Sequence, residues 1–385
     1  MPKRKIAIVT GIRSEYSLLY PLIKRVHESP LLELKLFVTG AHLSKSFGFT
    51  VSEIENDGFP IEERIESLVD SNTGSGRVKG AAIQLLALIE AFKRVKPDIV
   101  AAAFDREEAI TAALAASYMN IPIVHLGAGD RVVGNVDDYV RHAVTKLAHL
   151  HFAATESNRK RIIRMGEEPW RVYNTGNLGL DKYYMIQEMP IRKLKEILGF
   201  DITRHPLLVV IHNPLSTESE RAGCEAKVIM EVIDRLKFQT IVIHPNSDAG
   251  SLDIARVIDG YASRKFIKIF KNLPKEIFVN VMRKCDVLIG NSSCGILEAP
   301  LLKVPAVNIG MRQKGREHAG NVIFSDCDDK KIEQAIRKAI YDKRFRERLK
   351  RCGNPYGDGR ASERIVKVLT KIKLDRKLLQ KEITY

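Results

Sequence analysis

The chain has 385 residues, of which 45% are hydrophobic and 28% charged, a globular composition that excludes wholesale disorder. No apolar run approaches the roughly 18–20 residues that a membrane span needs. The apolar run 6–9 near the N-terminus is too short for the core of a signal peptide. We therefore expect a cytoplasmic protein that makes no membrane contact.

Basic residues exceed acidic ones, giving a formal net charge of +15. They are spread along the chain, often beside Glu, and no run of five or more occurs, so we expect no nucleic-acid partner. A small anionic substrate is compatible with the excess. The five cysteines are scattered and lack a C-x-x-C pair, which predicts reduced thiols. No cluster has metal-ligand spacing, and we expect no cofactor.

Short β-branched runs alternate with amphipathic stretches along the chain. The predicted strands are residues 6–9, 34–38, 99–102, 123–126, 151–154, 172–174, 207–211, 240–243, 267–269, 287–289 and 306–309. Helical patterns lie between strands, clearest at 18–26, 80–93, 107–118 and 137–150. This alternation predicts an α/β fold with parallel sheets covered on both faces.

The pattern runs twice, which predicts two doubly wound, Rossmann-like domains. We expect an N-terminal domain over residues 1–185, a C-terminal nucleotide-binding domain over 186–365, and a helix over 366–385 that packs back on the first domain. Open α/β sheets bind ligands beyond the carboxyl ends of their strands. An interdomain cleft lined by loops from both halves is therefore the expected site.

Charged side chains follow the first strands of the N-terminal half. Arg13 stands where the first helix begins, two residues after Gly11, and could fork onto phosphate or could be a surface arginine. Asp105 follows the strand 99–102. It could cap the next helix, or it could act as an acid or base at the strand end. The sequence alone leaves both alternatives open.

The stretch 121–152 is the richest in polar groups. Asp130 emerges from a glycine loop, and Asp137 begins a helix on which Arg141 lies one turn later, on the same face. We predict that Asp105, Asp130 and Asp137 crowd together, which splits their pKa values into an acid and a base. On the same helix, His142 and His149 could be ordinary core histidines.

In the C-terminal half, His212 and His244 each close a strand, and Asn246 follows the second. Both imidazoles could be neutral and capped, or could donate to phosphate. The loop after strand 287–289 is rich in small residues and resembles a diphosphate cradle, although a tight packing turn is the alternative. The candidate nucleotide-binding residues here are Asn291, Ser292, Ser293, Gly295, Glu298 for the ribose, and the later Arg312 and Gln313.

Several segments together resemble one family, the hydrolysing UDP-N-acetylglucosamine 2-epimerases of the sialic-acid pathway. They are GIRSEY, HLGAGDRVVGNVDDYVRHAVTKLAHLHF, HPNSDAGS, IGNSSCGILEAP, NIGMRQKGRE and NPYGDG, and the likeness covers nearly the whole chain. The resemblance implies a glycosyltransferase-B-like fold, a UDP-sugar substrate and a homo-oligomer, either a dimer or a tetramer.

The resemblance also implies roles for the candidate residues. Asp105, Asp130 and Asp137 match the family's acid/base carboxylates, and His212 its catalytic or phosphate-contacting histidine. The binding matches are Arg13 and the serine loop for the diphosphate and Glu298 for the ribose, with Arg141, His244, Asn246, Arg312 and Gln313 as further candidates. The implied reaction eliminates UDP to give 2-acetamidoglucal and then adds water, releasing N-acetylmannosamine.

The chain departs from the family pattern at three positions. Phe104 precedes Asp105 where the family usually has Gly, which should raise the pKa of Asp105 by desolvation. Asp130 stands where the family usually has Glu, and Asn213 where it commonly has Pro. These departures keep alternatives open: the same chemistry on a GDP- or UDP-diacetamido sugar of the legionaminic type, an impaired nucleotide-sugar-binding protein, or a glycosyltransferase.

Overall fold

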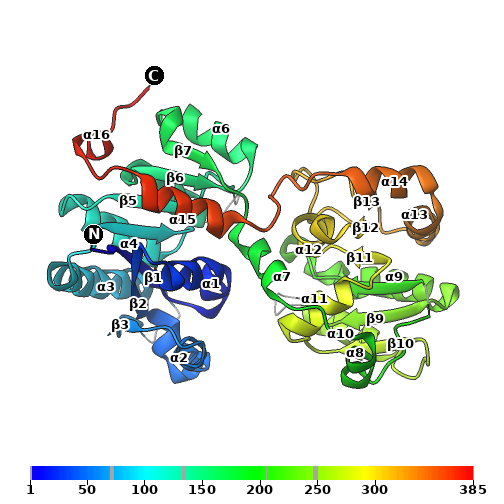
Figure 1. Cartoon of the computed structure of the whole chain (residues 1–385). Helices are drawn as coiled ribbons and strands as arrows, with labels where there is room; N and C mark the ends of the chain where they lie inside the picture. Colours follow the sequence, from blue (N-terminus) through cyan, green and yellow to red (C-terminus); the bar gives the residue numbers. More distant parts are fainter. Residues whose placement is uncertain (1, 70–72, 132–135, 205, 246–249, 385) are drawn as a thin grey trace. The chain divides into compact units, whose positions relative to one another are not determined.

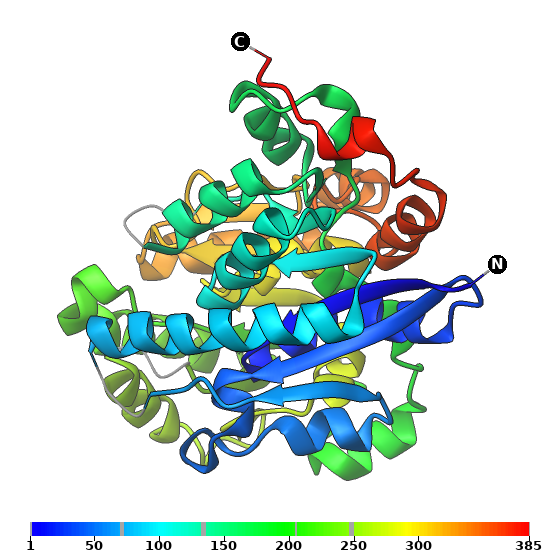
Figure 2. The same cartoon turned by 90° about the vertical axis from the view of Figure 1, so that its left-hand side faces the viewer.

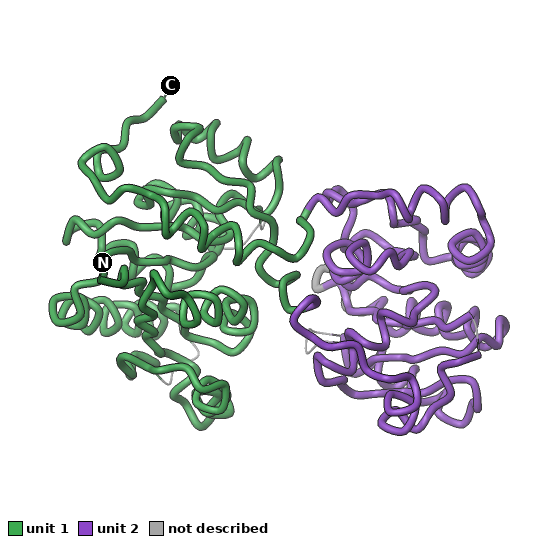
Figure 3. Tube along the Cα trace, in the orientation of Figure 1, with its two compact units in different colours: residues 1–182, 356–385 green, residues 183–355 purple. Residues whose placement is uncertain are grey.

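The computed structural model describes residues 2–69, 73–131, 136–204, 206–245 and 250–384. The chain forms two compact units, Met1–Lys182 with Tyr356–Tyr385 and Tyr183–Pro355 (Figure 3). The expected boundaries were 185 and 366. The return to unit 1 begins at Tyr356 because the Asn177 amide donates to the Tyr356 carbonyl at 2.7 Å, just before the last long helix.

Unit 1 is built on a seven-stranded parallel sheet in the order β3-β2-β1-β4-β5-β6-β7 (Figure 1). The strands are β1 (Arg4–Thr10), β2 (Leu32–Thr39), β3 (Ile61–Ile65), β4 (Ile99–Ala103), β5 (Ile123–Ala128), β6 (Leu150–Ala153) and β7 (Val172–Asn174). Each strand after β1 reaches its neighbour by a crossover, so the strand ends gather at one edge of the sheet. That edge carries the candidate carboxylates.

Helices cover both faces of this sheet, and β1 shows why. Ile6 and Ile8 point into one core, which α1 and α15 cover, whereas Ala7 and Val9 point into the other, which α3, α4 and α5 cover. Figure 2 shows the long α3 lying across the sheet. The main helices are α1 (Arg13–Glu28), α2 (Val51–Asn56), α3 (Gly74–Val95), α4 (Glu107–Tyr118), α5 (Val136–Leu147), α6 (Glu156–Arg164), α7 (Asp181–Met185), α15 (Ala361–Lys371) and α16 (Arg376–Leu379).

The C-terminal segment is fastened to unit 1 by polar contacts. The Asp181 carboxylate accepts the backbone N–H groups of Ala361 and Ser362 at 2.9 and 2.7 Å, which fixes the start of α15. The buried Arg171 donates to the carbonyls of Leu378, Lys377 and Gln380. The tail is therefore an integral part of unit 1.

Unit 2 has a six-stranded parallel sheet in the order β10-β9-β8-β11-β12-β13. The strands are β8 (Leu207–Ile211), β9 (Gln239–Ile243), β10 (Ile267–Phe270), β11 (Val287–Gly290), β12 (Ala306–Ile309) and β13 (Val322–Ser325). The helices are α8 (Ile191–Leu198), α9 (Ala222–Leu236), α10 (Ser251–Asp259), α11 (Lys275–Met282), α12 (Cys294–Leu297), α13 (Asp329–Tyr341) and α14 (Lys343–Arg351).

All eleven predicted strands are present, and two further edge strands are not among them. β3 has the sequence IEERI with only Ile65 buried, so it lacks the apolar signal of a central strand. β13 has the sequence VIFS, with three successive apolar residues of which only Val322 is buried; its signal is present in the sequence and was missed. The helix expected over 137–150 ends at Leu147, since Leu150 already begins β6. Within the described ranges, no helix is both long and apolar enough to cross a bilayer.

Candidate functional site

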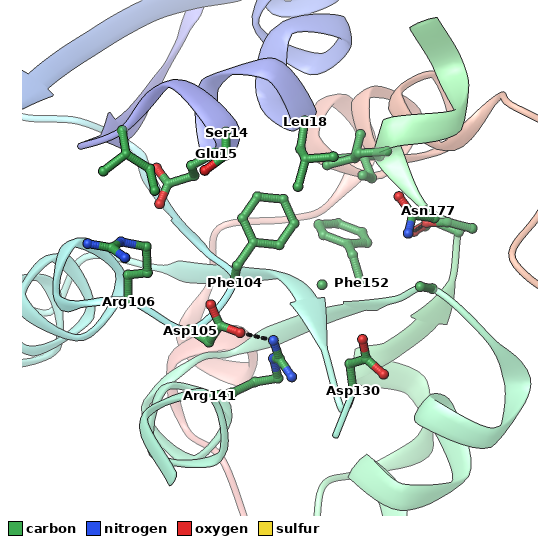
Figure 4. A pocket seen from close by; sticks show the side chains of 17 residues that line it. Ser14, Glu15, Leu18, Phe104, Asp105, Arg106, Asp130, Arg141, Phe152 and Asn177 are labelled. Atoms are coloured by element: carbon green, nitrogen blue, oxygen red, sulfur yellow. Dashed lines mark hydrogen bonds and ion pairs between the residues drawn. The ribbon is translucent and has the colours of Figure 1, made fainter. Parts of the chain in front are cut away.

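A cavity of about 260 Å³ opens at the carboxyl edge of the unit 1 sheet (Figure 4). Asp105, Asp130 and Arg141 line it together, from the ends of β4 and β5 and from α5. In Figure 4 these three polar side chains stand on one side, and Phe104, Phe152 and Leu18 stand on the other. Three predicted site residues from separate segments thus meet in one cavity with a polar and an apolar wall.

Asp105 forms an ion pair in the cavity. The Arg141 guanidinium donates to it, and the Arg141 side chain is almost fully buried. Burial raises the pKa of Asp105, Arg141 opposes that rise, and the negative charges of Asp137 and Asp130 add to it. Only two of the three carboxylates expected to crowd together, Asp105 and Asp130, line the cavity; Asp137 is not among its lining residues and acts on Asp105 through its charge. The direction of the pKa shift of Asp105 is the one expected for a desolvated carboxylate.

The interpretation of Asp105 as a helix cap is wrong. The N-cap of α4 is Arg106, and no side chain caps that helix end. The core interpretation is right for His149, whose Nδ1 accepts the Ile123 amide at 3.0 Å and whose pKa burial lowers to about 4. His142 is different: it is 26% exposed and lies 3.7 Å from an Asp138 oxygen, and its Nδ1 has no partner among the described residues.

The backbone before Asp105 is held by β5. The Phe104 amide donates to the Leu126 carbonyl at 2.9 Å, and His125 Nε2 lies 2.9 Å from the Phe104 carbonyl. Burial lowers the pKa of His125 to about 3, so the ring is neutral. Because a carbonyl oxygen only accepts, Nε2 carries the proton. His125 Nδ1 lies 3.1 Å from the Thr145 hydroxyl of α5. The His125 ring thus connects the Phe104 carbonyl, just beyond β4, to the helix that carries Arg141.

Several lining residues lack a signal in the sequence. Phe152 lies in β6 and Asn177 in the segment after β7, and only the folding of the sheet brings them to the cavity. Arg106 and Glu15 stand next to predicted residues and could have been included for that reason. Arg106 lines the cavity and donates to Glu107 and Glu108.

Glu15 is a buried carboxyl group beside this cavity. Neither of its oxygens makes a hydrogen bond of ordinary geometry within the described part of the chain. Burial and the neighbouring Glu108 raise the pKa of Glu15 well above the ordinary range, and the nearby Thr10 hydroxyl and Gly11 amide oppose this only partly. Burial and the charge of Glu108 therefore favour the protonated form of Glu15.

Arg13 begins α1 as predicted but does not line the cavity. Its side chain is 70% exposed and pairs with Glu53 of α2 at 2.8 Å. Because an exposed pair of this kind is weak, the guanidinium can leave Glu53 for a stronger anion.

In unit 2, the predicted small-residue loop follows β11 and is tightly built. Gly290 has φ +124, and a Cβ there would lie 2.1 Å from the Ile211 carbonyl, so only glycine fits. The Asn291 side chain exchanges two 2.7 Å hydrogen bonds with the Asn213 backbone. Gln313 donates to the Asn291 carbonyl at 3.0 Å and accepts from Arg316. Asn291 and Gln313 thus use their polar atoms to hold the loop itself.

The serines at this loop lead into α12, which is a single turn. The Ser292 hydroxyl lies 3.0 Å from Cys294 Sγ. The Ser293 carbonyl accepts the amides of Ile296 and Leu297 in α12. At Gly295, a Cβ would lie 3.1 Å from that of Ala306 in β12. Arg312 donates to the Asn291 carbonyl at 3.2 Å, which brings its guanidinium to the loop.

Glu298 lies one turn beyond the serines and has a carboxylate oxygen that could accept a hydrogen bond from a ligand. Its Oε2 is buried and has no hydrogen bond within the described part of unit 2, and its Oε1 is 3.9 Å from Lys275 Nζ. Burial raises the pKa of Glu298, and Lys275 opposes the rise. A hydroxyl donor from a ligand would satisfy the free oxygen.

The two strand-end histidines both face carboxylates. His212 is buried, with Nε2 3.1 Å from Glu225 Oε2, and its Nδ1 has no partner in the described ranges. His244 Nε2 lies 3.0 Å from Asp259 Oδ1. Asn246 lies outside the described residues. Among the described residues, no group of three or more His, Cys, Asp or Glu side chains could hold a metal ion.

The chain is similar along most of its length to known proteins of one family. A family model described as UDP-N-acetylglucosamine 2-epimerase matches residues 24–370. A hydrolyzing UDP-N,N'-diacetylbacillosamine 2-epimerase of Legionella pneumophila is 36% identical over 98% of each chain. A hydrolyzing GDP/UDP-N,N'-diacetylbacillosamine 2-epimerase of Campylobacter jejuni is 34% identical over 90% of each chain.

The fold has close counterparts as well. The crystal structure of a UDP-GlcNAc 2-epimerase from Neisseria meningitidis, bound to UDP-GlcNAc, superposes with a TM-score of 0.79 at 20% identity, over 96% of this chain and 100% of that one. The two-sheet α/β fold predicted from the sequence is therefore confirmed. By its sequence and its fold, this chain belongs to the UDP-N-acetylglucosamine 2-epimerase family of nucleotide-sugar 2-epimerases.

Proposed function

We propose that this enzyme is a hydrolysing 2-epimerase that converts a UDP-linked 2-acetamido sugar into the free 2-epimeric sugar and UDP. One observation carries the proposal. Asp105, Asp130 and the Arg141 guanidinium line one cavity, in which the pKa of Asp105 is raised. A carboxyl group whose pKa is raised, with a second carboxylate in the same cavity, is suited to the removal and return of a proton.

The proposed reaction has two steps. In the first, a carboxylate removes the proton from C2 while the C1–O bond breaks and UDP leaves, giving a 2-acetamidoglucal. In the second, water adds its oxygen to C1 and an acid returns a proton to the other face of C2. Asp105 suits the acid because its pKa is raised. Asp130 and Asp137, whose charges raise it, are the candidates for the base.

We assign the UDP moiety to the loop after β11. Ser292 and Ser293 would donate to the diphosphate with Arg312, and the unpaired Oε2 of Glu298 would accept a ribose hydroxyl. Because the Nε2 of His212 donates to Glu225, His212 would donate to phosphate through its Nδ1, which has no partner within the described residues, in the form of the ring that carries a proton on both nitrogens. Arg13, His244 and Asn246 remain predicted binding residues. Dimer or tetramer formation and a cytoplasmic location also remain predictions.

Two sugars are candidate substrates. The relatives at 36% and 34% identity are both named for N,N'-diacetylbacillosamine, so UDP-N,N'-diacetylbacillosamine is our first candidate. The second candidate is UDP-GlcNAc, which the family description names and which the resemblance in sequence implies. With UDP-GlcNAc the product would be N-acetylmannosamine.

The test is proton NMR of each UDP-sugar with the enzyme in heavy water. Release of UDP with deuterium at C2 of the free 2-epimeric sugar supports the proposal and identifies the substrate. Asp137→Asn should abolish turnover and leave UDP binding nearly intact, whereas Glu90→Gln, an exposed change on α3, should alter neither. UDP binding without turnover of either sugar would favour the binding-protein alternative, and transfer to an added acceptor a glycosyltransferase.

A further inference from the structure

Phe104 has an unusual backbone conformation. Its φ is +63°, in the left-handed region that favours glycine and disfavours a bulky side chain. Hydrogen bonds to Leu126 and His125 hold the peptide groups on both of its sides, so the conformation is imposed by the strand edge. Strained residues of this kind persist where the surrounding structure fixes them, and they cluster at functional sites.

The Phe104 ring occupies space that its neighbours leave for it. A Cβ at Gly127 would lie 2.7 Å from the ring, so a side chain at position 127 would collide with it. Together with Phe152 and Leu18 the ring lines the cavity opposite Asp105 and Arg141 (Figure 4). The chain thus tolerates a strained phenylalanine at a position where glycine would adopt the backbone more easily, directly before a candidate catalytic carboxylate.

We propose that Phe104 is a specificity-determining residue whose ring receives a methyl group of the sugar and so favours a methyl-bearing UDP-sugar over UDP-GlcNAc. This inference rests on the proposed function and narrows its substrate. A ring face offers no hydrogen bond to a sugar hydroxyl but gains contact with a methyl group. N,N'-diacetylbacillosamine has two such groups that GlcNAc lacks, the C6 methyl and the methyl of the C4 acetamido group.

The size of the expected preference follows from the chemistry. An apolar pocket discriminates a methyl from a hydroxymethyl group by only about 10- to 100-fold in kcat/KM. The extra hydroxyl still fits in the pocket, and its only cost is that it has no hydrogen-bond partner there. A preference of that size is measurable and does not forbid slow turnover of UDP-GlcNAc.

The experiment compares three substrates by UDP release: UDP-N,N'-diacetylbacillosamine, UDP-GlcNAc, and the 6-deoxy analogue of UDP-GlcNAc, which differs from it only at C6. The wild-type enzyme should prefer the first over the second by roughly 10- to 100-fold. If the 6-deoxy analogue shares that preference, the ring contacts the C6 methyl; if it behaves like UDP-GlcNAc, the ring contacts the C4 acetamido group. Either result supports the proposal.

Phe104→Gly removes the ring and suits the backbone, so the variant should fold and its preference should fall at least fivefold towards unity. Phe104→Leu keeps an apolar side chain and should keep most of the preference. Phe49→Gly is the matched control. Phe49 also has a positive φ, of 47°, but is 44% exposed and does not line the cavity, so the preference should not change.

Equal kcat/KM for the three sugars in the wild type would overturn the proposal, and so would an unchanged preference in Phe104→Gly. Should Phe104→Gly be inactive, Phe104→Asn decides in its place, because asparagine tolerates a positive φ and its polar side chain offers no apolar wall: an unchanged preference in that variant would contradict the role of the ring. Failure of the proposed function has a separate signature, since the wild type would then release UDP from none of the sugars.

Discussion

The Arg141 guanidinium on α5 donates to the Asp105 carboxylate beyond β4, so two residues 36 positions apart form the central ion pair of the cavity. The other two guanidinium nitrogens of Arg141, Nε and Nη1, have no hydrogen-bond partner among the described residues. A buried guanidinium with free donors beside a carboxylate can hold that carboxylate in place and still bind an oxygen of a ligand.

Replacing Arg141 should therefore impair catalysis and shift its pH dependence. In Arg141→Met the cation that lowers the pKa of Asp105 is gone, so that pKa rises further. We expect kcat/KM to fall on the order of 100-fold, and the limb of the pH–rate profile that reports Asp105 to move to higher pH. Arg141→Lys keeps the charge and should shift the limb less, and Arg192→Met on exposed α8 should not shift it. If that limb of the pH–rate profile does not move in Arg141→Met, Asp105 is not the group whose ionisation controls the rate.

Glu298 should contribute to nucleotide affinity through its unpaired oxygen. Glu298→Gln should weaken UDP binding by about 1–3 kcal/mol, measured by calorimetry, because a charged acceptor is lost. The pKa of Glu298 is raised by burial, so in the wild type the affinity should be full above that pKa and decline as the pH falls through it. Glu276→Gln, on the exposed side of α11, is the control. An unaltered affinity in Glu298→Gln would contradict the ribose assignment.

Glu15 should make the free energy of unfolding decrease as the pH rises. Its folded pKa is raised above the ordinary value of 4.5, so the folded state retains a proton that the unfolded state has lost. Stability is therefore highest below about 4.5 and decreases as the pH rises through the folded pKa. Glu15→Gln should lack this decrease in urea unfolding and gain stability over wild type at alkaline pH, and Glu28→Gln on α1 should not. Parallel pH curves for wild type and Glu15→Gln would show that Glu15 is ionised.

Lys381 should stabilise the candidate catalytic helix from the far end of the chain. Its ammonium donates to the carbonyls of Lys146 and Ala148 at the end of α5 and lies 3.0 Å from buried Glu167. Lys381→Met should cost about 1–3 kcal/mol of unfolding free energy, because those acceptors lose their donor. Lys373→Met, an exposed change in the same tail, should cost little.

The contacts of Glu167 with His151, Lys146 and Lys381 also predict that the free energy of unfolding decreases at acid pH. Although burial raises the pKa of Glu167, hydrogen bonds from His151 and Lys146 and the charge of Lys381 lower it to about 2. The stabilisation is complete above about 4.5 and is lost as the pH falls towards 2. A Lys381→Met variant with wild-type stability at pH 7 would exclude the contact as a stabilising one.

The sequence by itself determined the fold class and the residues at the strand ends. Apolar runs mark the central strands because parallel strands are buried on both faces, and the edge strand β3 was missed because it is polar. The edge strand β13 was missed although its sequence, VIFS, is mostly apolar. Asp105 and Asp130 were found because polar residues just after buried strands gather at one sheet edge, and Arg141 because it lies four residues after Asp137 on one helix.

Only the tertiary structure decided what each of these residues does there. Asp105 meets Arg141 instead of capping α4, and Asn291 and Gln313 spend their polar atoms on their own loop. The left-handed conformation of Phe104 depends on hydrogen bonds to His125 and Leu126, 21 and 22 residues away in sequence, and the raised pKa of Glu15 depends on burial and on Glu108. Partners, burial and strain are properties of groups that meet only after folding, so local sequence patterns do not contain them.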